Sequence, residues 1–182
     1  YKGYYKGVFP VKVNQQAQVI DRIVDFGKEF DFGLEVGSKP ELLIALAHDL
    51  SSESTIICNG IKDKEFINLA ILSLKIGFKT ILVLESPREL DLIIEASQEL
   101  NVRPLLGIRV KLTNKVSGNW SQSSGDRSAF GMSVEQVMKV ITKLKVNYYL
   151  DCLVLQHSHL GSQIPDIIEI RKATQEACSC LL

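Results

Sequence analysis

The chain has 182 residues, 46% of them hydrophobic and 23% charged, a composition that is typical of a folded globular domain and excludes a disordered tail, a collagen-like repeat and a disulfide-rich miniprotein. Its 21 Lys and Arg residues balance 21 Asp and Glu residues, which argues against nucleic acid and anionic membrane surfaces as partners. This charge balance makes a small-molecule substrate the expectation. No apolar run approaches the roughly 18 residues that span a bilayer.

Short runs rich in β-branched residues alternate along the chain with helical segments. The predicted strands are Val8–Val13, Phe30–Val36, Thr55–Asn59, Thr80–Glu85, Leu105–Leu112 and Cys152–Leu160. Four of the five intervals between their first residues are 22 to 25 residues long, the length of one βα unit with short loops. The pattern therefore predicts six βα units.

Helix boundaries are indicated by capping residues. The predicted N-caps are Ser38, Asp63, Ser86 and Ser133. The three serines are each followed three residues later by Glu or Gln, which is the capping-box pattern. Gly27 and Gly77 follow predicted helices at positions that favour a left-handed residue.

Regular alternation of strands and helices predicts an α/β fold with a parallel sheet, either doubly wound or closed as a (β/α)₈ TIM-type barrel. The glycine-rich turn of a dinucleotide-binding sheet is missing after the first strand, where Val13–Gln16 stand, so the barrel is favoured. Residues Thr113–Met132, which include Trp120, form a long loop. In a barrel this loop lies at the active-site face, although a surface insertion without function explains its composition equally well.

Ionisable residues stand near the carboxyl ends of four predicted strands. They are Lys12, Glu35, Arg109 and the pair His157 and His159. Each alone has an ordinary explanation as a solvated or packing side chain. Together, at one end of a barrel, they predict a substrate site. A lysine in apolar surroundings has a lowered pKa and can attack a carbonyl group, so Schiff-base chemistry is expected.

Four segments resemble the biosynthetic arginine decarboxylases, which are pyridoxal-phosphate enzymes with an alanine racemase-like barrel. They are VFPVKVNQQ around Lys12, FGLEVGSKPELL around Glu35, VRPLLGIRVKL around Arg109 and HSHLGSQIP around His159. The resemblance extends over the whole chain in the same order.

This resemblance implies roles for five residues. Lys12 matches the lysine that forms the internal aldimine with the cofactor, and His159 matches the histidine that stacks on the pyridine ring, so these two are the predicted catalytic residues. Ser162 matches a hydroxyl that helps to hold the phosphate. Glu35 matches an acidic residue close to the cofactor, and Arg109 an arginine on the cofactor side.

The implied reaction is decarboxylation of L-arginine to agmatine and CO₂, a step of polyamine synthesis. The implied cofactor is pyridoxal 5'-phosphate, with Mg²⁺ as a second ion for which no ligand residues are assigned. The family also implies a homo-oligomer in the cytoplasm, or in a plastid of a photosynthetic eukaryote. Residues 1–182 would be the N-terminal part of the cofactor-binding barrel domain, about six of its eight βα units, without the remaining strands and the C-terminal β-domain. We expect such a piece alone to be inactive.

Two positions depart from the family pattern. Ala129 replaces a lysine that precedes Phe130 in the family, near the subunit contact, and Ser158 replaces an aromatic residue. Two alternatives therefore stay open: a non-catalytic homologue that regulates an active partner, and a sister decarboxylase that acts on ornithine or diaminopimelate. For His157 we expect packing or support of a neighbouring group.

The four cysteines show neither a zinc-binding spacing nor a redox pair, which predicts reduced thiols. Cys178 and Cys180 lie in a predicted helix and do not replace the catalytic cysteine of the family's β-domain.

Overall fold

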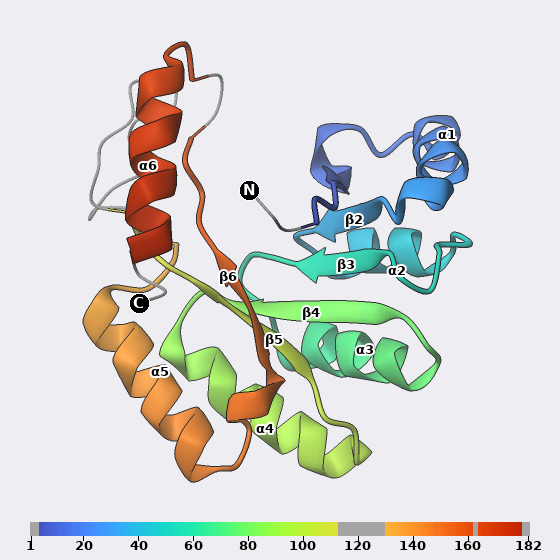
Figure 1. Ribbon diagram of the computed structural model, residues 1–182. Helices are drawn as coiled ribbons and strands as arrows, with labels where there is room; N and C mark the ends of the chain where they lie inside the picture. The colour runs from blue at the N-terminus through green and yellow to red at the C-terminus, as the bar shows by residue number, and fades with distance from the viewer. Residues whose placement is uncertain (1–3, 113–129, 162–163, 180–182) are drawn as a thin grey trace. The chain divides into compact units, whose positions relative to one another are not determined.

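The computed structural model describes residues 4–112, 130–161 and 164–179, in which strands and helices alternate (Figure 1). The strands are β1 (Val8–Pro10), β2 (Gly33–Val36), β3 (Thr55–Cys58), β4 (Lys79–Leu84), β5 (Leu105–Arg109) and β6 (Leu153–His157). The helices are α1 (Ala17–Gly27), α2 (Lys39–Leu46), α3 (Lys64–Lys75), α4 (Pro87–Leu100), α5 (Val134–Val146) and α6 (Ile167–Ser179). Short 3₁₀ turns are η1 (Val11–Val13), η2 (Lys28–Phe30) and η4 (Leu150–Cys152). The predicted series of six βα units is confirmed.

The strands follow chain order in one sheet, β1-β2-β3-β4-β5-β6. The first three pairs are parallel, with Pro10 opposite Glu35 and Val36 opposite Cys58. A doubly wound sheet reverses its strand order at a switch point, and this sheet has no reversal. The observed order is the one that a (β/α) barrel repeats, so the prediction of a barrel over a doubly wound sheet is confirmed.

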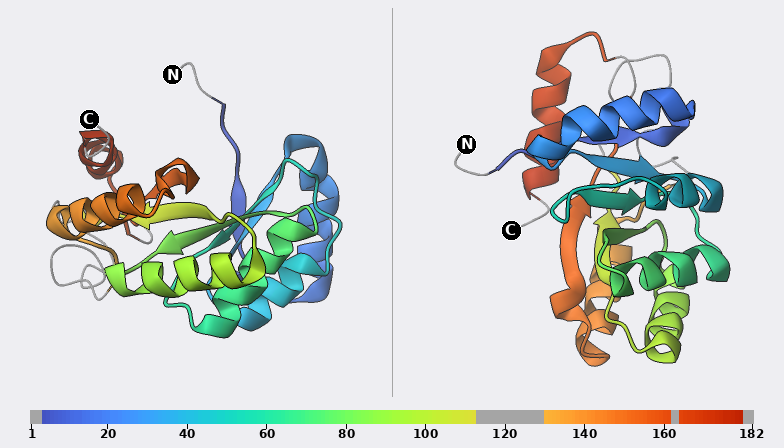
Figure 2. Two further views of the ribbon diagram at one scale, coloured as in Figure 1. Left: turned by 90° about the horizontal axis from the view of Figure 1, so that it is seen from below. Right: turned by 90° about the vertical axis from the view of Figure 1, so that its right-hand side faces the viewer.

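The contacts divide the chain into two compact units. The first comprises residues 1–83 and 91–106, and the second comprises residues 84–90 and 107–182. In the first unit, α2 and α3 lie side by side against the strands (Figure 2). Its core contains fully buried aliphatic side chains from strands and helices, including Ile20, Leu34, Ile56 and Ile67. This packing fixes the strand ends of the unit in place.

The second unit has its own buried side chains. Ile108, Met132, Val140 and Leu144 are almost completely removed from solvent. The backbone N–H of Val110, just beyond β5, donates to the carbonyl of His157 at the end of β6 at 2.9 Å. These contacts bring the ends of β5 and β6 together within the unit.

The first strand is shorter than predicted. We expected Val8–Val13 to be extended, but β1 ends at Pro10 and Val13 is 68% exposed. Pro10 has no N–H to continue a ladder, and the chain turns directly into η1. Lys12 therefore lies in a 3₁₀ turn and not in a strand.

The predicted N-caps agree with the structure where their bonds are described. The side chains of Ser38, Asp63 and Ser133 accept hydrogen bonds from backbone N–H groups three residues later, and Ser133 forms a full capping box with Gln136. Such caps satisfy N–H groups that the first turn of a helix leaves unpaired.

The two glycine predictions have different outcomes. Gly77 has a φ of +99°, the left-handed conformation expected after α3. The prediction for Gly27 is wrong, because its φ is −79° and the chain continues into η2. The left-handed residue here is Asp31, with a φ of +53°, whose backbone N–H bonds to the carbonyl of Lys28.

Candidate functional site

Lys12 is presented on a short, fixed turn after β1. Its neighbour Val11 is completely buried, and the N–H of Asn14 donates to the carbonyl of Val11 at 3.1 Å, which closes the turn. The side chain of Lys12 itself is exposed. The amine is thus accessible on a backbone that packing and a hydrogen bond hold in place.

The segment that follows Lys12 is connected to the start of α2 by a carboxylate. Glu41 is 8% exposed, and its side chain accepts hydrogen bonds from the backbone N–H of Gly37 at 2.7 Å and from Nε2 of Gln15 at 3.2 Å. The capping box predicted that Glu41 would bond back to Ser38, whereas its carboxylate reaches one residue further and also bonds to Gln15. Sequence reasoning did not include Glu41 in the site.

Glu35 lies at the end of β2, next to β3. The side-chain amide of Asn59, which follows β3, donates to the carboxylate of Glu35 at 3.0 Å, and the backbone N–H of Asn59 donates to the carbonyl of Val36 at 2.8 Å. Asn59 was predicted as a strand end without a role. Its two bonds fix the direction of the half-buried Glu35 side chain.

Two further buried groups lie at the end of β3 and just after it. Lys62 is 2% exposed and donates from Nζ to the carbonyls of Gly60 and Val83, the latter at 2.6 Å. Burial raises the pKa of the Cys58 thiol to about 12. The thiol of Cys58 therefore remains protonated near neutral pH and cannot act as a nucleophile.

In the second unit, Arg109 at the end of β5 forms an ion pair. Its Nη1 lies 2.8 Å from Oε1 of Glu85, and the side chains of Arg109 and Glu85 are 14% and 2% exposed. The guanidinium carbon lies 5.4 Å from the centre of the Phe130 ring, which is within the range of a cation–π contact. The predicted cationic residue is therefore held by two neighbours that the sequence did not identify.

The histidines lie at and beyond the end of β6. His157 is the last residue of β6 and half-buried, and its carbonyl accepts the N–H of Val110. His159 follows the strand and is exposed. Ser162, together with Ala129, Trp120 and Cys180 from the sequence predictions, lies outside the described residues.

The predicted site residues thus form two groups. Lys12 and Glu35 lie at the carboxyl ends of neighbouring strands in the first unit, since Glu35 pairs with Pro10, two residues before Lys12. Arg109 at the end of β5 and His159 beyond β6 belong to the second unit, and Val110 and His157 join those strand ends. The meeting of all of them in one site stays a prediction.

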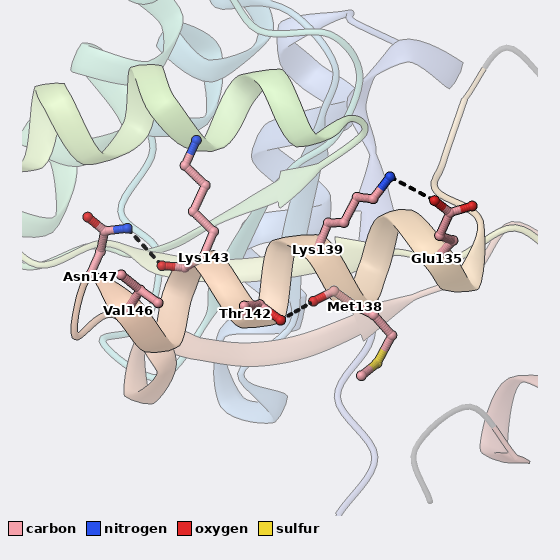
Figure 3. A pocket seen from close by; sticks show the side chains of 7 residues that line it. All are labelled: Glu135, Met138, Lys139, Thr142, Lys143, Val146 and Asn147. Atoms are coloured by element: carbon pink, nitrogen blue, oxygen red, sulfur yellow. Dashed lines mark hydrogen bonds and ion pairs between the residues drawn. The ribbon is translucent and has the colours of Figure 1, made fainter.

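A surface pocket is present elsewhere, along the outer side of α5 (Figure 3). Its lining comes from one helix and its C-cap, with Met138 and Val146 as apolar members and Lys139 paired with Glu135 at 2.7 Å. None of the predicted site residues lines this pocket.

Two kinds of feature are absent from the described part of the chain. Within residues 4–112, 130–161 and 164–179 there is no group of three or more His, Cys, Asp or Glu side chains that could hold a metal ion. In the same part of the chain, every helix is too short or too polar to cross a membrane.

The chain is similar to known proteins along its whole length. A family model described as the pyridoxal binding domain of pyridoxal-dependent decarboxylases matches residues 2–181. A biosynthetic arginine decarboxylase of Gloeobacter violaceus is 50% identical over 181 residues, which are 100% of this chain and 28% of that protein. The chain therefore spans little more than a quarter of this curated relative.

Solved structures show the same fold. The crystal structure of the biosynthetic arginine decarboxylase from Campylobacter jejuni matches with a TM-score of 0.86 and 35% identity, covering 99% of this chain and 28% of that one. Alanine racemase from Clostridium difficile 630 matches with a TM-score of 0.62 over 97% of this chain and 43% of that one. Its 11% identity makes this second likeness one of fold alone.

Proposed function

The chain belongs to the pyridoxal-dependent decarboxylases, as part of their pyridoxal binding domain, and we propose that the complete protein containing it converts L-arginine to agmatine and CO₂. The identity with biosynthetic arginine decarboxylases along the whole chain supports arginine as the substrate. The observation that carries the proposal is the exposed amine of Lys12, presented on a fixed turn at the carboxyl end of β1.

The donor set suits pyridoxal phosphate. This cofactor carries an aldehyde, a phosphate dianion and a flat aromatic ring. Lys12 supplies an accessible amine, Arg109 a permanent cation, and His159 a flat imidazole in an exposed position. When bound, pyridoxal phosphate accepts the electron pair that the departing carboxyl group leaves on the substrate.

Lys12 and Glu35 act on the aldehyde side of the cofactor in this proposal. The amine of Lys12 binds the cofactor aldehyde, and the fixed turn limits the directions in which Nζ can point. Glu35, aligned by Asn59, stands beside the strand from which Lys12 emerges. Fixed donors and acceptors of this kind lower the cost of orienting a substrate.

Arg109, His159 and Ser162 act on the other groups of the cofactor. Arg109 binds an anionic oxygen, His159 stacks on the ring and Ser162 donates to the phosphate, as the family resemblance implies for the last two. The reaction breaks the bond between Cα and the carboxylate and returns a proton to Cα. The residues that bind the cofactor favour this bond cleavage because they hold the scissile bond in one orientation.

The remaining parts of the proposal concern the complete protein. Residues 1–182 form the N-terminal part of its barrel domain, with the other strands and a β-domain supplied outside this range. The free thiols of Cys58, Cys152 and Cys178 support a reducing compartment such as the cytoplasm. We keep a homo-oligomer as part of the proposal, and we assign no residues to Mg²⁺, for which the described residues contain no ligand cluster.

The test is turnover by the complete protein loaded with pyridoxal phosphate. We expect agmatine and CO₂ from arginine, faster than CO₂ from ornithine or diaminopimelate. Lys12→Ala removes the activity, while Lys28→Ala, which alters an exposed lysine paired with Asp49, leaves it unchanged. Faster turnover of another amino acid contradicts the substrate, and an inactive protein that activates a catalytic paralogue supports the regulatory alternative.

A further inference from the structure

Glu85 is a buried carboxylate that the proposed function does not yet use. It follows β4, and its side chain is 2% exposed. Oε1 accepts a hydrogen bond from Nη1 of Arg109 at 2.8 Å, and Oε2 accepts one from the backbone N–H of Gly131 at 3.1 Å. Both oxygens are therefore engaged by groups of the second unit.

The backbone at Glu85 is fixed as well. Its N–H donates to the carboxylate of Glu89, in the first turn of α4, at 2.7 Å. This arrangement repeats the one at α2, where the N–H of Gly37 donates to Glu41 at 2.7 Å. A carboxylate with a fixed backbone and two bonded oxygens has little rotational freedom.

Residues 130–132, whose Gly131 N–H bonds to Glu85, also contact Arg109 directly. The N–H of Met132 donates to the carbonyl of Arg109 at 2.8 Å, and the N–H of Lys111 donates to the carbonyl of Met132 at 2.9 Å. Gly131 has a φ of +82°, and a Cβ at this position would lie 3.2 Å from Cγ of Arg109. Phe130, next in this segment, faces the guanidinium.

Arg109 is thus oriented by the carboxylate of Glu85 at Nη1 and by the Phe130 ring, over which its guanidinium carbon lies. A buried ion pair is costly to form and costly to break, because removal of one partner leaves the other charge without compensation. The pair through Nη1 uses one part of a guanidinium that carries several other N–H donors. These donors are then aimed in a fixed direction.

We propose that Glu85 is a positioning residue that orients Arg109 toward an anionic oxygen of bound pyridoxal phosphate. Its second oxygen holds Gly131, which keeps Phe130 against the guanidinium. This inference rests on the proposed function, since it assumes that Arg109 contacts the cofactor. Glu85 itself acts through Arg109.

The test is a double-mutant cycle on cofactor affinity in the complete protein, with the variants Glu85→Gln, Arg109→Gln and their combination. The dissociation constant of pyridoxal phosphate is measured by titration of the cofactor-free protein. Glu85→Gln weakens binding by about 2- to 150-fold, the range of coupling between contacting groups. The double variant binds no more weakly than Arg109→Gln alone, because Glu85 has no other path to the cofactor.

The matched control is Glu95→Gln, which removes an exposed α4 carboxylate that pairs with Lys64 of α3. It should leave the dissociation constant unchanged. Glu85→Asp keeps the charge on a shorter side chain and should bind with intermediate affinity. Unchanged affinity in Glu85→Gln, or additive losses in the double variant, overturns the role of Glu85.

A second measurement applies even where Glu85 variants do not fold. Addition of pyridoxal phosphate should slow hydrogen exchange at the Gly131 amide of the otherwise unaltered protein, because ordering Arg109 also orders its carboxylate partner. Arg109→Gln should show no such slowing, and equal slowing in both proteins contradicts the inference. If the unaltered protein binds no pyridoxal phosphate, the proposed function fails; if it binds and only the Glu85 results disagree, the inference alone fails.

Discussion

The side-chain amide of Asn59 donates a hydrogen bond of 3.0 Å to the carboxylate of Glu35, between the ends of the neighbouring strands β3 and β2. Asn59 is also bonded through its backbone to Val36, which holds the chain that carries this amide next to the end of β2. This contact gives Glu35 one direction before any cofactor binds.

Asn59→Ala should lower the stability of the complete protein by about 1 kcal/mol, because the half-buried carboxylate of Glu35 loses this donor. The change is measured as a decrease in the thermal unfolding midpoint. Asn147→Ala is the control, since that amide bonds to the carbonyl of Lys143 at an exposed helix end. Equal midpoints for Asn59→Ala and the unaltered protein would show that the Glu35 contact contributes nothing.

Glycines 33 and 37 should respond differently to alanine. A Cβ at Gly33 would lie 2.0 Å from the backbone carbonyl oxygen of Thr55, so Gly33→Ala must separate β2 from β3. A Cβ at Gly37 would meet only the side chain of Glu41, at an ordinary 3.7 Å. Gly33→Ala should be recovered in insoluble form or with a strongly lowered unfolding midpoint, and Gly37→Ala as folded protein. A stable Gly33→Ala protein contradicts the close strand approach.

Thiol reactivity should separate the cysteines of the native protein. Cys58 and Cys152 are buried, whereas Cys178 is exposed. Treatment with N-ethylmaleimide at pH 7.5, about one unit below the usual thiol pKa, followed by peptide mass spectrometry should find Cys178 modified and Cys58 unmodified. Unfolding in denaturant should make both react. Rapid modification of native Cys58 would contradict its burial.

The raised pKa of Cys58 also predicts a pH dependence of stability. The native thiol keeps its proton up to a pKa of about 12, whereas the unfolded thiol releases it near 9.0. Between these values the unfolded state binds fewer protons, so stability falls as the pH rises. The decrease is up to about 1.4 kcal/mol per pH unit.

The measurement compares the denaturant midpoint of the unaltered protein with that of Cys58→Ala at pH 8 and pH 10, values about one unit below and above the unfolded thiol pKa. Between pH 8 and pH 10, the denaturant midpoint of the unaltered protein should decrease more than that of Cys58→Ala. Parallel pH dependence in both would contradict a buried neutral thiol.

Much of the fold follows from local sequence signals. The β-branched runs locate all six strands, because each strand is a short run set between helical patterns, and β2 to β5 also contain buried residues. The misplaced boundaries have local physical causes. Val11–Val13 has strand-forming residues, yet Pro10 ends the ladder and the chain turns. Gly27 continues in helical conformation because the left-handed position is taken by Asp31.

The candidate site could be predicted only in part. Lys12, Glu35 and Arg109 were identified because charged residues at strand ends stand out from apolar patterns. Their partners Asn59 and Glu85 were not, since hydrogen bonds between segments 24 residues apart leave no trace in periodicity. Buried carboxylates next to helix starts resemble ordinary capping residues, and Glu41 and Glu85 show that such residues merit examination as partners of site residues.

The most direct test of the central claim is the identification of the lysine that binds the cofactor. The complete protein is incubated with pyridoxal phosphate, reduced with borohydride and digested, and the pyridoxyl-modified peptide is sequenced by mass spectrometry. We expect the modification on Lys12 and its disappearance in Lys12→Ala, with Lys28→Ala still modified. Stable modification of another lysine, or none in the unaltered protein, would contradict the assignment of Lys12.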